Sequence, residues 1–141
     1  MAEIQFVHDA LSFVDQGVVT AGFDAHSASL AAPEYKSERL HWRALNESGH
    51  LIGALTANLL WDWLYIDELW VDEQHRKEGL GKQLMGEAEN LAQSQDLSGL
   101  WLWTQSWQAE AFYKKLGYIE FTRFDNFPKG HERIGLRKQL Q

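Results

Sequence analysis

The stretch that most limits the possible folds of this chain runs from Leu64 to Met85. It opens with LYIDELWV, a mostly apolar run typical of a buried strand, and continues with the charged segment DEQHRKEG. Apolar residues then recur every three or four positions, which predicts a helix containing Leu80, Leu84, Ala88 and Leu91. A strand, a turn and a helix N-terminus in this order form an anion site, because unpaired N–H groups and the helix dipole point to the same place.

The turn itself carries Arg-x-x-Gly-x-Gly at Arg76, Gly79 and Gly81. The glycines remove Cβ atoms where a ligand approaches the backbone and where the turn can need a positive φ. A Walker A loop is excluded, because Gly81 and Lys82 are not followed by Ser or Thr. A dinucleotide-binding fingerprint is excluded as well, because Leu84 stands where the third glycine is required.

The remaining arrangement resembles motif A of the GNAT N-acetyltransferases (the Gcn5-related family). In that motif Arg/Gln-x-x-Gly-x-Gly/Ala holds the pyrophosphate of acetyl-coenzyme A, and LYIDELWV is similar to the family's fourth strand. A purely structural loop is the alternative interpretation.

A second match lies in TQSWQAEAFYKKLGYIEF, residues 104–121. It resembles the segment after the family's fifth strand, and the positions that fit its spacing are Ala109, Tyr113, Gly117 and Tyr118. In a group of small bacterial members a later Pro-x-Gly-His precedes the final strand, as the residues from Pro128 to His131 do here. The resemblance therefore covers roughly residues 49–140 and identifies the chain as a small single-domain member.

The resemblance and the hydrophobic pattern together predict a mixed α/β fold. We expect a GNAT sheet of six or seven strands, flanked by helices and splayed at the coenzyme A cleft. Period-two alternation and apolar runs predict strands at Glu3 to His8, Arg39 to Leu45, His50 to Leu60, from Leu64, Leu100 to Thr104, Tyr118 to Phe124, and Ile134 to Leu140. Helices are expected from Asp9, as its cap, to about His26, from the glycine turn to about Gln95, and from Trp107 to Leu116 with Gly117 following.

Length and composition set further bounds. The 141 residues fit one domain, expected over 1–141. A net charge of −7 argues against nucleic acid and favours a cationic acceptor, although an acidic surface kept for solubility explains it equally well. No apolar run reaches the about 20 residues of a membrane span, and MAEIQFVHD lacks the pattern of an export signal. We therefore expect a cytoplasmic protein with no membrane partner.

We expect neither cysteine chemistry nor a metal site in this chain. The chain has no cysteine, which excludes disulfides and a thiolate nucleophile. Its six histidines show no metal-ligand spacing.

The resemblance assigns coenzyme A contacts to a set of residues on the fourth strand, the turn and the later helix: Leu69, Trp70, Val71, Arg76, Lys77, Glu78, Gly79, Leu80, Gly81, Lys82, Ser106 and Tyr113. Two of them depart from the family pattern. Ser106 stands where the family often has asparagine, and Glu78 stands where it often has a basic residue, which opposes phosphate binding unless the side chain points away.

The fourth strand has a break in its alternation. Apolar residues at Ile66, Leu69 and Val71 leave period two between 66 and 69, which predicts a β-bulge. A bulge frees N–H and C=O groups that can pair with the amides of pantetheine as an added strand would. An N–H group there can also stabilise the oxyanion of acyl transfer.

Catalysis, as the family implies it, transfers acetyl directly from the thioester to an amine. An amine is almost wholly protonated at pH 7, so a base or a water chain must remove a proton. Glu68 and Asp67 are the candidate bases, with Glu68 slightly favoured; both can instead be surface charges or orient the substrate. Tyr113 lies where the family places the acid for the departing thiolate, and a core tyrosine is the alternative.

Seven tryptophans are unusually many for this length. Trp61, Trp63 and Trp70 flank the motif strand, and Trp101 and Trp103 share one face of the next. Such a wall can bind a cation, but filling of the core is the commoner role.

The function predicted from the sequence is therefore an acetyl-CoA-dependent N-acetyltransferase acting on a primary amine of a small molecule, peptide or protein. A non-catalytic acyl-CoA-binding module of the same fold is the alternative. A homodimer through the C-terminal strands fits the family.

Overall fold

The computed structural model describes residues 2–141, and its contacts divide the chain into two compact units, Met1–Tyr35 and Lys36–Gln141. The first unit contains helix α1 (Phe13–Ser29), and the second contains every strand. A single domain over residues 1–141 stays a prediction. No helix of the described residues is long and apolar enough to cross a membrane.

The first unit corrects two predictions. The strand predicted at Glu3 to His8 is wrong, because residues 2–12 contain no strand and every strand pair joins segments between 37 and 139. Alternation over six residues does not supply the partner that a ladder needs. The predicted cap at Asp9 is also wrong: Ser12 caps α1 by accepting a hydrogen bond from the Asp15 backbone N–H at 3.0 Å.

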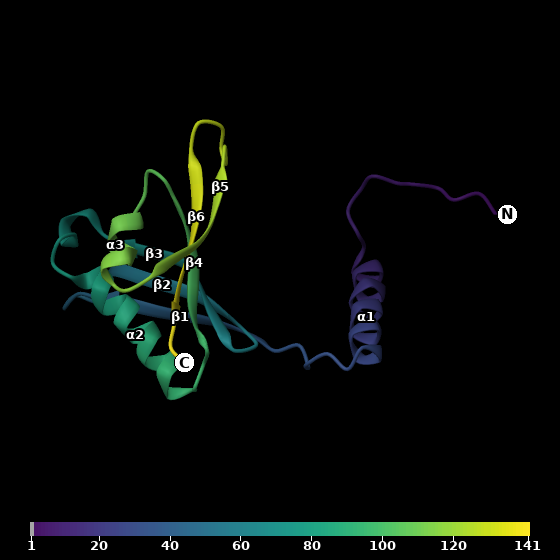
Figure 1. Ribbon diagram of the computed structural model, residues 1–141, viewed down its shortest axis with the longest axis horizontal. Coiled ribbons are helices and arrows are strands. Elements are labelled where there is room, and N and C mark those ends of the chain that lie inside the picture. Colours follow the sequence, from purple (N-terminus) through teal and green to yellow (C-terminus); the bar gives the residue numbers. More distant parts are fainter. Residues whose placement is uncertain (1) are drawn as a thin grey trace. The chain divides into compact units, whose positions relative to one another are not determined.

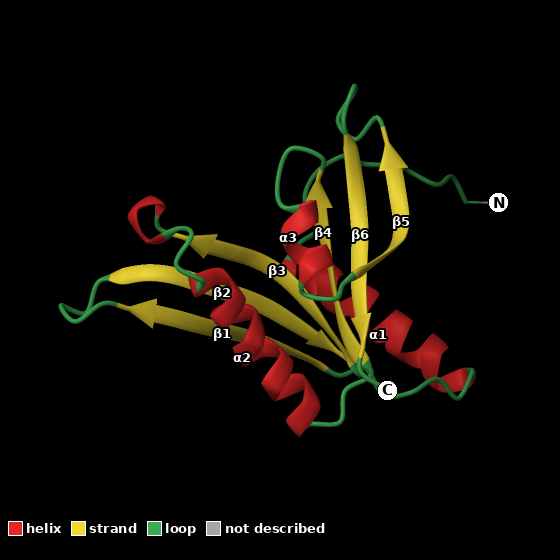
Figure 2. Ribbon diagram, turned by 60° about the vertical axis from the view of Figure 1, so that its left-hand side comes forward, coloured by secondary structure: helices red, strands yellow, loops and turns green. Residues whose placement is uncertain are grey.

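The second unit is a six-stranded mixed sheet, which confirms the predicted α/β class (Figures 1 and 2). Its strand order is β1-β2-β3-β4-β6-β5, with β3 and β4 parallel and the other neighbours antiparallel. The strands are β1 (Ser37–Leu45), β2 (Leu51–Leu60), β3 (Trp63–Val71), β4 (Gly99–Gln105), β5 (Ile119–Asp125) and β6 (Glu132–Gln139). The helical elements are the short 3₁₀ helix η1 (Glu73–His75), α2 (Leu80–Ser94) and α3 (Glu110–Lys115).

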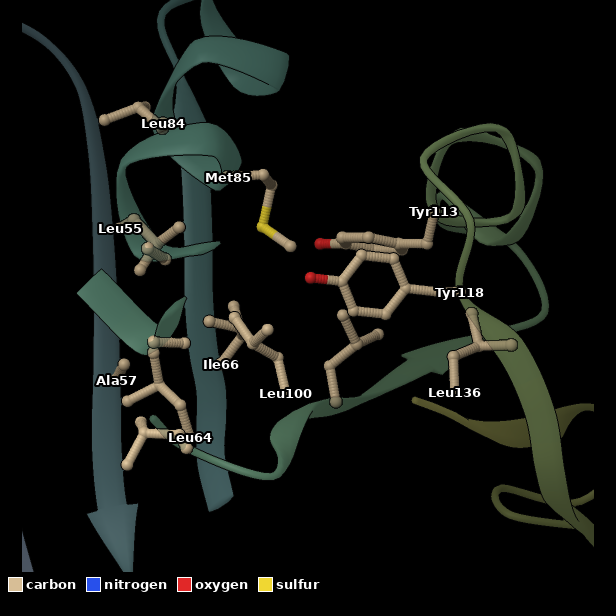
Figure 3. Packing of buried hydrophobic residues seen from close by; sticks show 14 of the residues in the cluster. Leu55, Ala57, Leu64, Ile66, Leu84, Met85, Leu100, Tyr113, Tyr118 and Leu136 are labelled. Carbon is tan, nitrogen blue, oxygen red and sulfur yellow. The ribbon is translucent and has the colours of Figure 1, made fainter. Parts of the chain in front are cut away.

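The core lies on the face of the sheet that α2 and α3 cover. Alternate residues of the four central strands point into it, such as Leu64 and Ile66 of β3 and Leu100 and Leu102 of β4. The stripe of α2 that meets them consists of Leu84, Met85, Ala88 and Ala92. Figure 3 shows Met85 pointing from this helix toward Tyr113 and Tyr118. The periodicities of two and 3.6 in the sequence therefore meet on one apolar layer.

The parallel pairing of β3 and β4 stops halfway along both strands. It runs from Trp63 opposite Gly99 to Ile66 opposite Leu102, and beyond this point the two strands diverge (Figure 2). The predicted bulge is confirmed at the same level, because the β2–β3 register skips Asp67. The predicted splay of the sheet is thus present, and it opens toward the C-terminal ends of β3 and β4.

Helix α3 is shorter than the predicted range of Trp107 to Leu116. Two hydrogen bonds organise the residues before it as a loop: Gln105 N donates to Gln108 Oε1 at 2.9 Å, and Ala109 N donates to Thr104 Oγ1 at 3.3 Å. Its C-terminal end follows the prediction, because Gly117 has a φ of +98° and the next N–H, of Tyr118, bonds back to the Tyr113 carbonyl at 3.1 Å.

Candidate active site

The loop between β3 and α2 is held in shape by its own polar groups. Asp72 Oδ2 caps η1 by accepting from Gln74 N at 3.1 Å. Arg76 Nε donates to the Val71 carbonyl at 3.2 Å and so ties the loop back to the end of β3. Lys77 and Gly79 both have a positive φ, of 67° and 83°, which turns the chain into α2. The motif residues therefore build the turn itself.

The N-terminus of α2 has no internal cap. Gly79 is its N-cap residue, no side chain accepts from the first turn, and that turn contains no acidic residue. The first intrahelical bond joins Gln83 N to the Gly79 carbonyl, which leaves the N–H groups of the preceding residues, Leu80, Gly81 and Lys82, without an intrahelical partner. These donors and the helix dipole together favour a bound anion such as a phosphate.

A cavity of 740 Å³ lies in the splay, bounded by β3, this loop and the start of α3. Ten of the twelve residues expected to contact coenzyme A line it: Leu69, Trp70, Val71, Arg76, Lys77, Gly79, Leu80, Gly81, Lys82 and Tyr113. The structure brings these residues together from sequence positions up to 44 apart. Four further lining residues were not anticipated, namely His75, Gln108, Ala109 and Phe112.

The other two expected contacts lie outside the cavity wall. Glu78 forms a contact of 3.5 Å between its Oε2 and His75 Nδ1, and its side chain is largely exposed. Ser106 Oγ accepts from Glu132 N at 3.2 Å and joins the loop after β4 to the start of β6. Glu78 therefore does not place its charge on the cavity wall, where it would oppose a phosphate.

Gly81 lies on the cavity wall, where Phe112 and Val71 limit the size of any side chain. A Cβ atom on Gly81 would lie 3.4 Å from Phe112 Cζ and 3.8 Å from Val71 Cγ2, so a methyl group fits but a longer side chain fills the opening. Phe112 comes from α3, directly before Tyr113, and packs edge-on against its ring at 5.1 Å. A pattern search for charged or small residues misses Phe112, because its role here is one of shape.

Tyr113 is 9% exposed and contributes to both the core and the cavity. Burial raises the pKa of its phenol to about 12, so the hydroxyl stays protonated at any ordinary pH. Burial alone causes this shift in pKa, and no hydrogen bond or neighbouring charge contributes to it. The hydroxyl is consequently a donor available to a ligand in the cavity.

The position of Tyr113 depends on a polar cluster at the other end of α3. Lys138 Nζ donates to Glu89 Oε1 at 3.1 Å and to the Leu116 carbonyl at 2.9 Å, while the Tyr118 hydroxyl donates to Glu89 Oε1 at 3.2 Å. Burial, followed by the charge of Glu89, raises the pKa of Tyr118. The cluster joins α2, α3 and β6, and Figure 3 shows the rings of Tyr113 and Tyr118 side by side.

The candidate bases lie on the opposite face of the sheet, at the bulge. Asp67 Oδ2 contacts Arg39 Nη1 at 2.9 Å, and the same nitrogen donates to Asn58 Oδ1 at 3.1 Å. Glu68 Oε1 accepts from Thr56 Oγ1 at 3.0 Å and lies 3.7 Å from Arg39 Nη2. The bulge thus brings both carboxylates to one guanidinium, and Glu68 is the more exposed of the two, at 69% against 36%.

The tryptophans also lie away from the core, so filling of the core is the wrong interpretation for them. Trp63, Trp101 and Trp103 are half-buried on the face opposite α2, and Trp61 and Trp70 are exposed. The rings of Trp101 and Trp103 lie 6.3 Å apart, edge to face, as expected for one face of β4.

Comparison with known proteins agrees with this geometry. Residues 13–118 match the family model described as the Acetyltransferase (GNAT) family. A blasticidin-S acetyltransferase from Streptomyces morookaense is 36% identical over 98 residues, which cover 69% of this chain and 72% of that protein. An acetyltransferase from Bacillus cereus ATCC 14579, solved as a crystal structure, is 30% identical with a TM-score of 0.83 and covers 96% of this chain and 98% of its own.

A third relative was solved with a ligand. It is a protein from Bacillus anthracis str. Ames in complex with acetyl-coenzyme A, 24% identical, with a TM-score of 0.67 over 75% of this chain and 65% of that one. The family model and the 36% identical relative confirm the predicted family and the acetyl-CoA-dependent acetyltransferase activity, and the Bacillus cereus structure confirms the predicted fold. The chain belongs to the GNAT family of acetyltransferases, and acetyl-CoA is its acetyl donor.

Proposed function

We propose that this protein transfers the acetyl group directly from acetyl-CoA to a primary amine while both substrates are bound. One observation carries the proposal: β3 and β4 stop pairing after Ile66 and Leu102, and a cavity beside the unpaired end of β3 reaches the uncapped start of α2. A diphosphate at that helix N-terminus directs the thiol arm of the coenzyme into the splay. The thioester then lies beside the bulge at Asp67.

In the chemical step the amine nitrogen attacks the thioester carbon and a C–N bond forms. The negative charge that develops on the carbonyl oxygen needs a donor, and β3 residues beyond Ile66 have no β4 partner to occupy their backbone groups. In enzymes, loss of one such donor raises the barrier by about 3 kcal/mol. The tetrahedral intermediate collapses when the C–S bond breaks and coenzyme A leaves as the thiolate.

We propose that Glu68, rather than Asp67, is the general base that accepts the proton of the attacking amine. Asp67 Oδ2 already accepts from Arg39 at 2.9 Å, so a proton arriving there would break that ion pair. Glu68 is held more loosely, through the Thr56 hydroxyl and a longer contact to Arg39. An amine of pKa ~10.4 is neutral in only about one molecule in a few thousand at pH 7, which is why a base is required.

Tyr113 assists the departing thiolate by donating a hydrogen bond. With a pKa of about 12 against ~8.5 for a thiol, complete proton transfer is uphill by about 5 kcal/mol. A hydrogen bond to the developing charge costs no such transfer and is stronger than a neutral one. The thiolate therefore takes its proton from solvent after release.

We further propose a small-molecule amine as the acceptor. The supporting observation is the identity of 36% to a blasticidin-S acetyltransferase, which is named for a small molecule. A peptide or protein amine remains the second candidate. A homodimer through the C-terminal strands, of which β5 forms the sheet edge, and a cytoplasmic location stay predictions.

A screen of amines tests the proposal. The protein is incubated with acetyl-CoA and, in turn, blasticidin S, a polyamine, free amino acids and a peptide with a free N-terminus, and release of thiol is followed. We expect amine-dependent thiol release with at least one small molecule. Tight binding of acetyl-CoA without acetylation of any amine would instead favour a non-catalytic acyl-CoA-binding module.

A further inference from the structure

One cation on the sheet face opposite α2 is used by none of the steps above. Arg133 is on β6, opposite Gln105 of β4 and Phe124 of β5. Because Arg133 is next to the buried Ile134 in the strand, its side chain lies on the opposite face of the sheet from the core, together with Trp103. Gln105 ends β4 beyond the last residue that pairs with β3, so Arg133 lies beside the splayed half of the sheet.

Aromatic rings hold this guanidinium in place. Arg133 Cζ lies 4.7 Å from the centroid of the Trp103 ring and 5.3 Å from that of Phe127. Stacking of this kind stabilises the cation and orients its plane but supplies no negative charge. Within residues 36–141 none of the ion pairs includes Arg133, in contrast to Arg39 and Arg123, whose guanidinium groups contact carboxylates.

Arg133 and Asp67, the neighbour of the proposed base in the chain, both act on the Tyr65 side chain. Burial, and then the charge of Asp67, raise the pKa of the Tyr65 phenol, whereas the charge of Arg133 and a hydrogen bond from it lower that pKa. Asp67 and Arg133 therefore act on the same hydroxyl from β3 and from β6. The splay thus has carboxylates on one side and an oriented guanidinium without a carboxylate on the other.

We propose that Arg133 binds a carboxylate of the acceptor while the acceptor's amine reaches Glu68. The preferred substrates are then small molecules that carry both a primary amine and a carboxylate. A guanidinium offers a planar fork of N–H donors that matches a carboxylate, and the contacts with two rings restrict its motion before the substrate binds. The coenzyme's phosphates are excluded as its partner, because the cavity with the α2 N-terminus is lined by residues of the other face and not by Arg133.

This inference rests on the proposed function. Pairs of acceptor substrates distinguish a failure of the inference from a failure of the proposed function. Each pair consists of an amino acid and its amide, such as β-alanine with β-alaninamide and lysine with lysinamide. KM and kcat are measured by thiol release for the wild type, Arg133→Gln, Arg133→Lys and Arg137→Gln. Arg137 is the matched control, because it also stacks on rings of this face, Trp63 and Phe121, but lies beside the paired half of β3 and β4.

For the wild type we expect a lower KM for the carboxylate member. Arg133→Gln should raise that KM about tenfold or more and leave KM for the amide and kcat within about twofold, since a hydrogen bond to a charged group is lost. For Arg133→Lys, KM for the carboxylate substrate should lie between the values for the wild type and Arg133→Gln. Arg137→Gln should have the same KM values as the wild type. These results would support the inference.

Equal KM values for acid and amide in the wild type would overturn the inference, as would an equal rise for both members of a pair in Arg133→Gln. That second outcome would assign Arg133 a structural role in the aromatic face. If other amines are acetylated in either case, the proposed function stands without the inference. If no amine of any kind is acetylated, the proposed function itself fails.

Discussion

The two faces of the sheet in residues 36–141 achieve recognition by different means. On the face covered by α2 and α3, the cavity is lined by apolar side chains, polar side chains of the loop and of the segment before α3, and the backbone donors of the first turn of α2. On the other face, charged and aromatic side chains from β1, β2, β3, β4 and β6 meet around the bulge. The phosphate-binding end of the coenzyme side is thus built by one local segment, whereas the acceptor side depends on the pairing of several strands.

This difference suits the two substrates. A coenzyme that does not change is served by a loop whose geometry is fixed by positive φ angles at Lys77 and Gly79 and by the bond from Arg76 to the Val71 carbonyl. An acceptor is chosen by side chains, and these can change without altering the strands that carry them. Mutations in the loop and first turn of α2 should therefore affect coenzyme affinity, and mutations on the second face should affect turnover and acceptor choice.

The largest effect is expected on the coenzyme side. Gly81→Glu places a carboxylate in the cavity, against Phe112 and Val71, and should weaken acetyl-CoA binding by about 100-fold or more, roughly 2.7 kcal/mol. Isothermal titration calorimetry measures this directly. Gly86→Glu is the control, because Gly86 is on the same helix and a Cβ there meets nothing within 4 Å. Equal affinities of Gly81→Glu and Gly86→Glu for acetyl-CoA would show that the coenzyme does not bind on this face.

The next effect concerns the bulge on the acceptor side. Glu68→Gln should lower kcat by about 100-fold and leave the affinity for acetyl-CoA unchanged, since general-base catalysis typically contributes that much. Asp67→Asn should cost less and act partly by releasing Arg39. Rate–pH profiles of both variants are the measurement. Two profiles identical to that of the wild type would exclude both carboxylates and leave a water chain as the base.

A smaller effect is expected where Tyr113 reaches the cavity from the core. Tyr113→Phe removes one hydrogen bond to the leaving thiolate and should lower kcat about tenfold, roughly 1.4 kcal/mol, with the Kd of acetyl-CoA within about twofold. Tyr118→Phe is the comparison, because that hydroxyl bonds Glu89 instead of lining the cavity and should affect stability alone. Full activity of Tyr113→Phe would remove the phenol from the reaction.

The smallest effect is a change of stability in alkali. Burial raises the pKa of Tyr113 to about 12, so above pH ~10 the unfolded state loses this proton while the folded state keeps it. The unfolded state then binds fewer protons, and the free energy of unfolding falls as pH rises from ~10 to 12, by up to about 1.4 kcal/mol per pH unit for this group. Urea unfolding at pH 9 and pH 11 should show a smaller fall for Tyr113→Phe than for the wild type.

The same contrast between faces explains how much the sequence could reveal. The residues from Arg76 to Lys82 act through their own backbone, so the motif predicted a loop and helix that line the cavity together. The break in alternation between Ile66 and Leu69 predicted the bulge for the same local reason. Gly117 likewise ends α3 through a positive φ that its type favours.

The contacts on the acceptor side could not be predicted from local sequence patterns, because they depend on which strands pair and in which register. Arg39 reaches Asp67 across 28 positions, and Thr56 reaches Glu68 only because β2 and β3 pair in this register. Nothing in the tryptophan pattern shows which face of β4 the core occupies. The strand predicted at Glu3 to His8 failed for a related reason, since alternation does not reveal whether a partner strand exists. The cap of α1 did have a local signal, Ser12 three residues before Asp15.

The most direct test of the account follows backbone amide and tryptophan indole resonances by NMR while acetyl-CoA is added. We predict the largest shifts at the amides of Leu69 to Val71 and Arg76 to Lys82, in the segments that line the cavity. The indoles of Trp101 and Trp103, on the opposite face, should change little. Large shifts at Trp101 and Trp103 with unmoved amides between 76 and 82 would contradict the account.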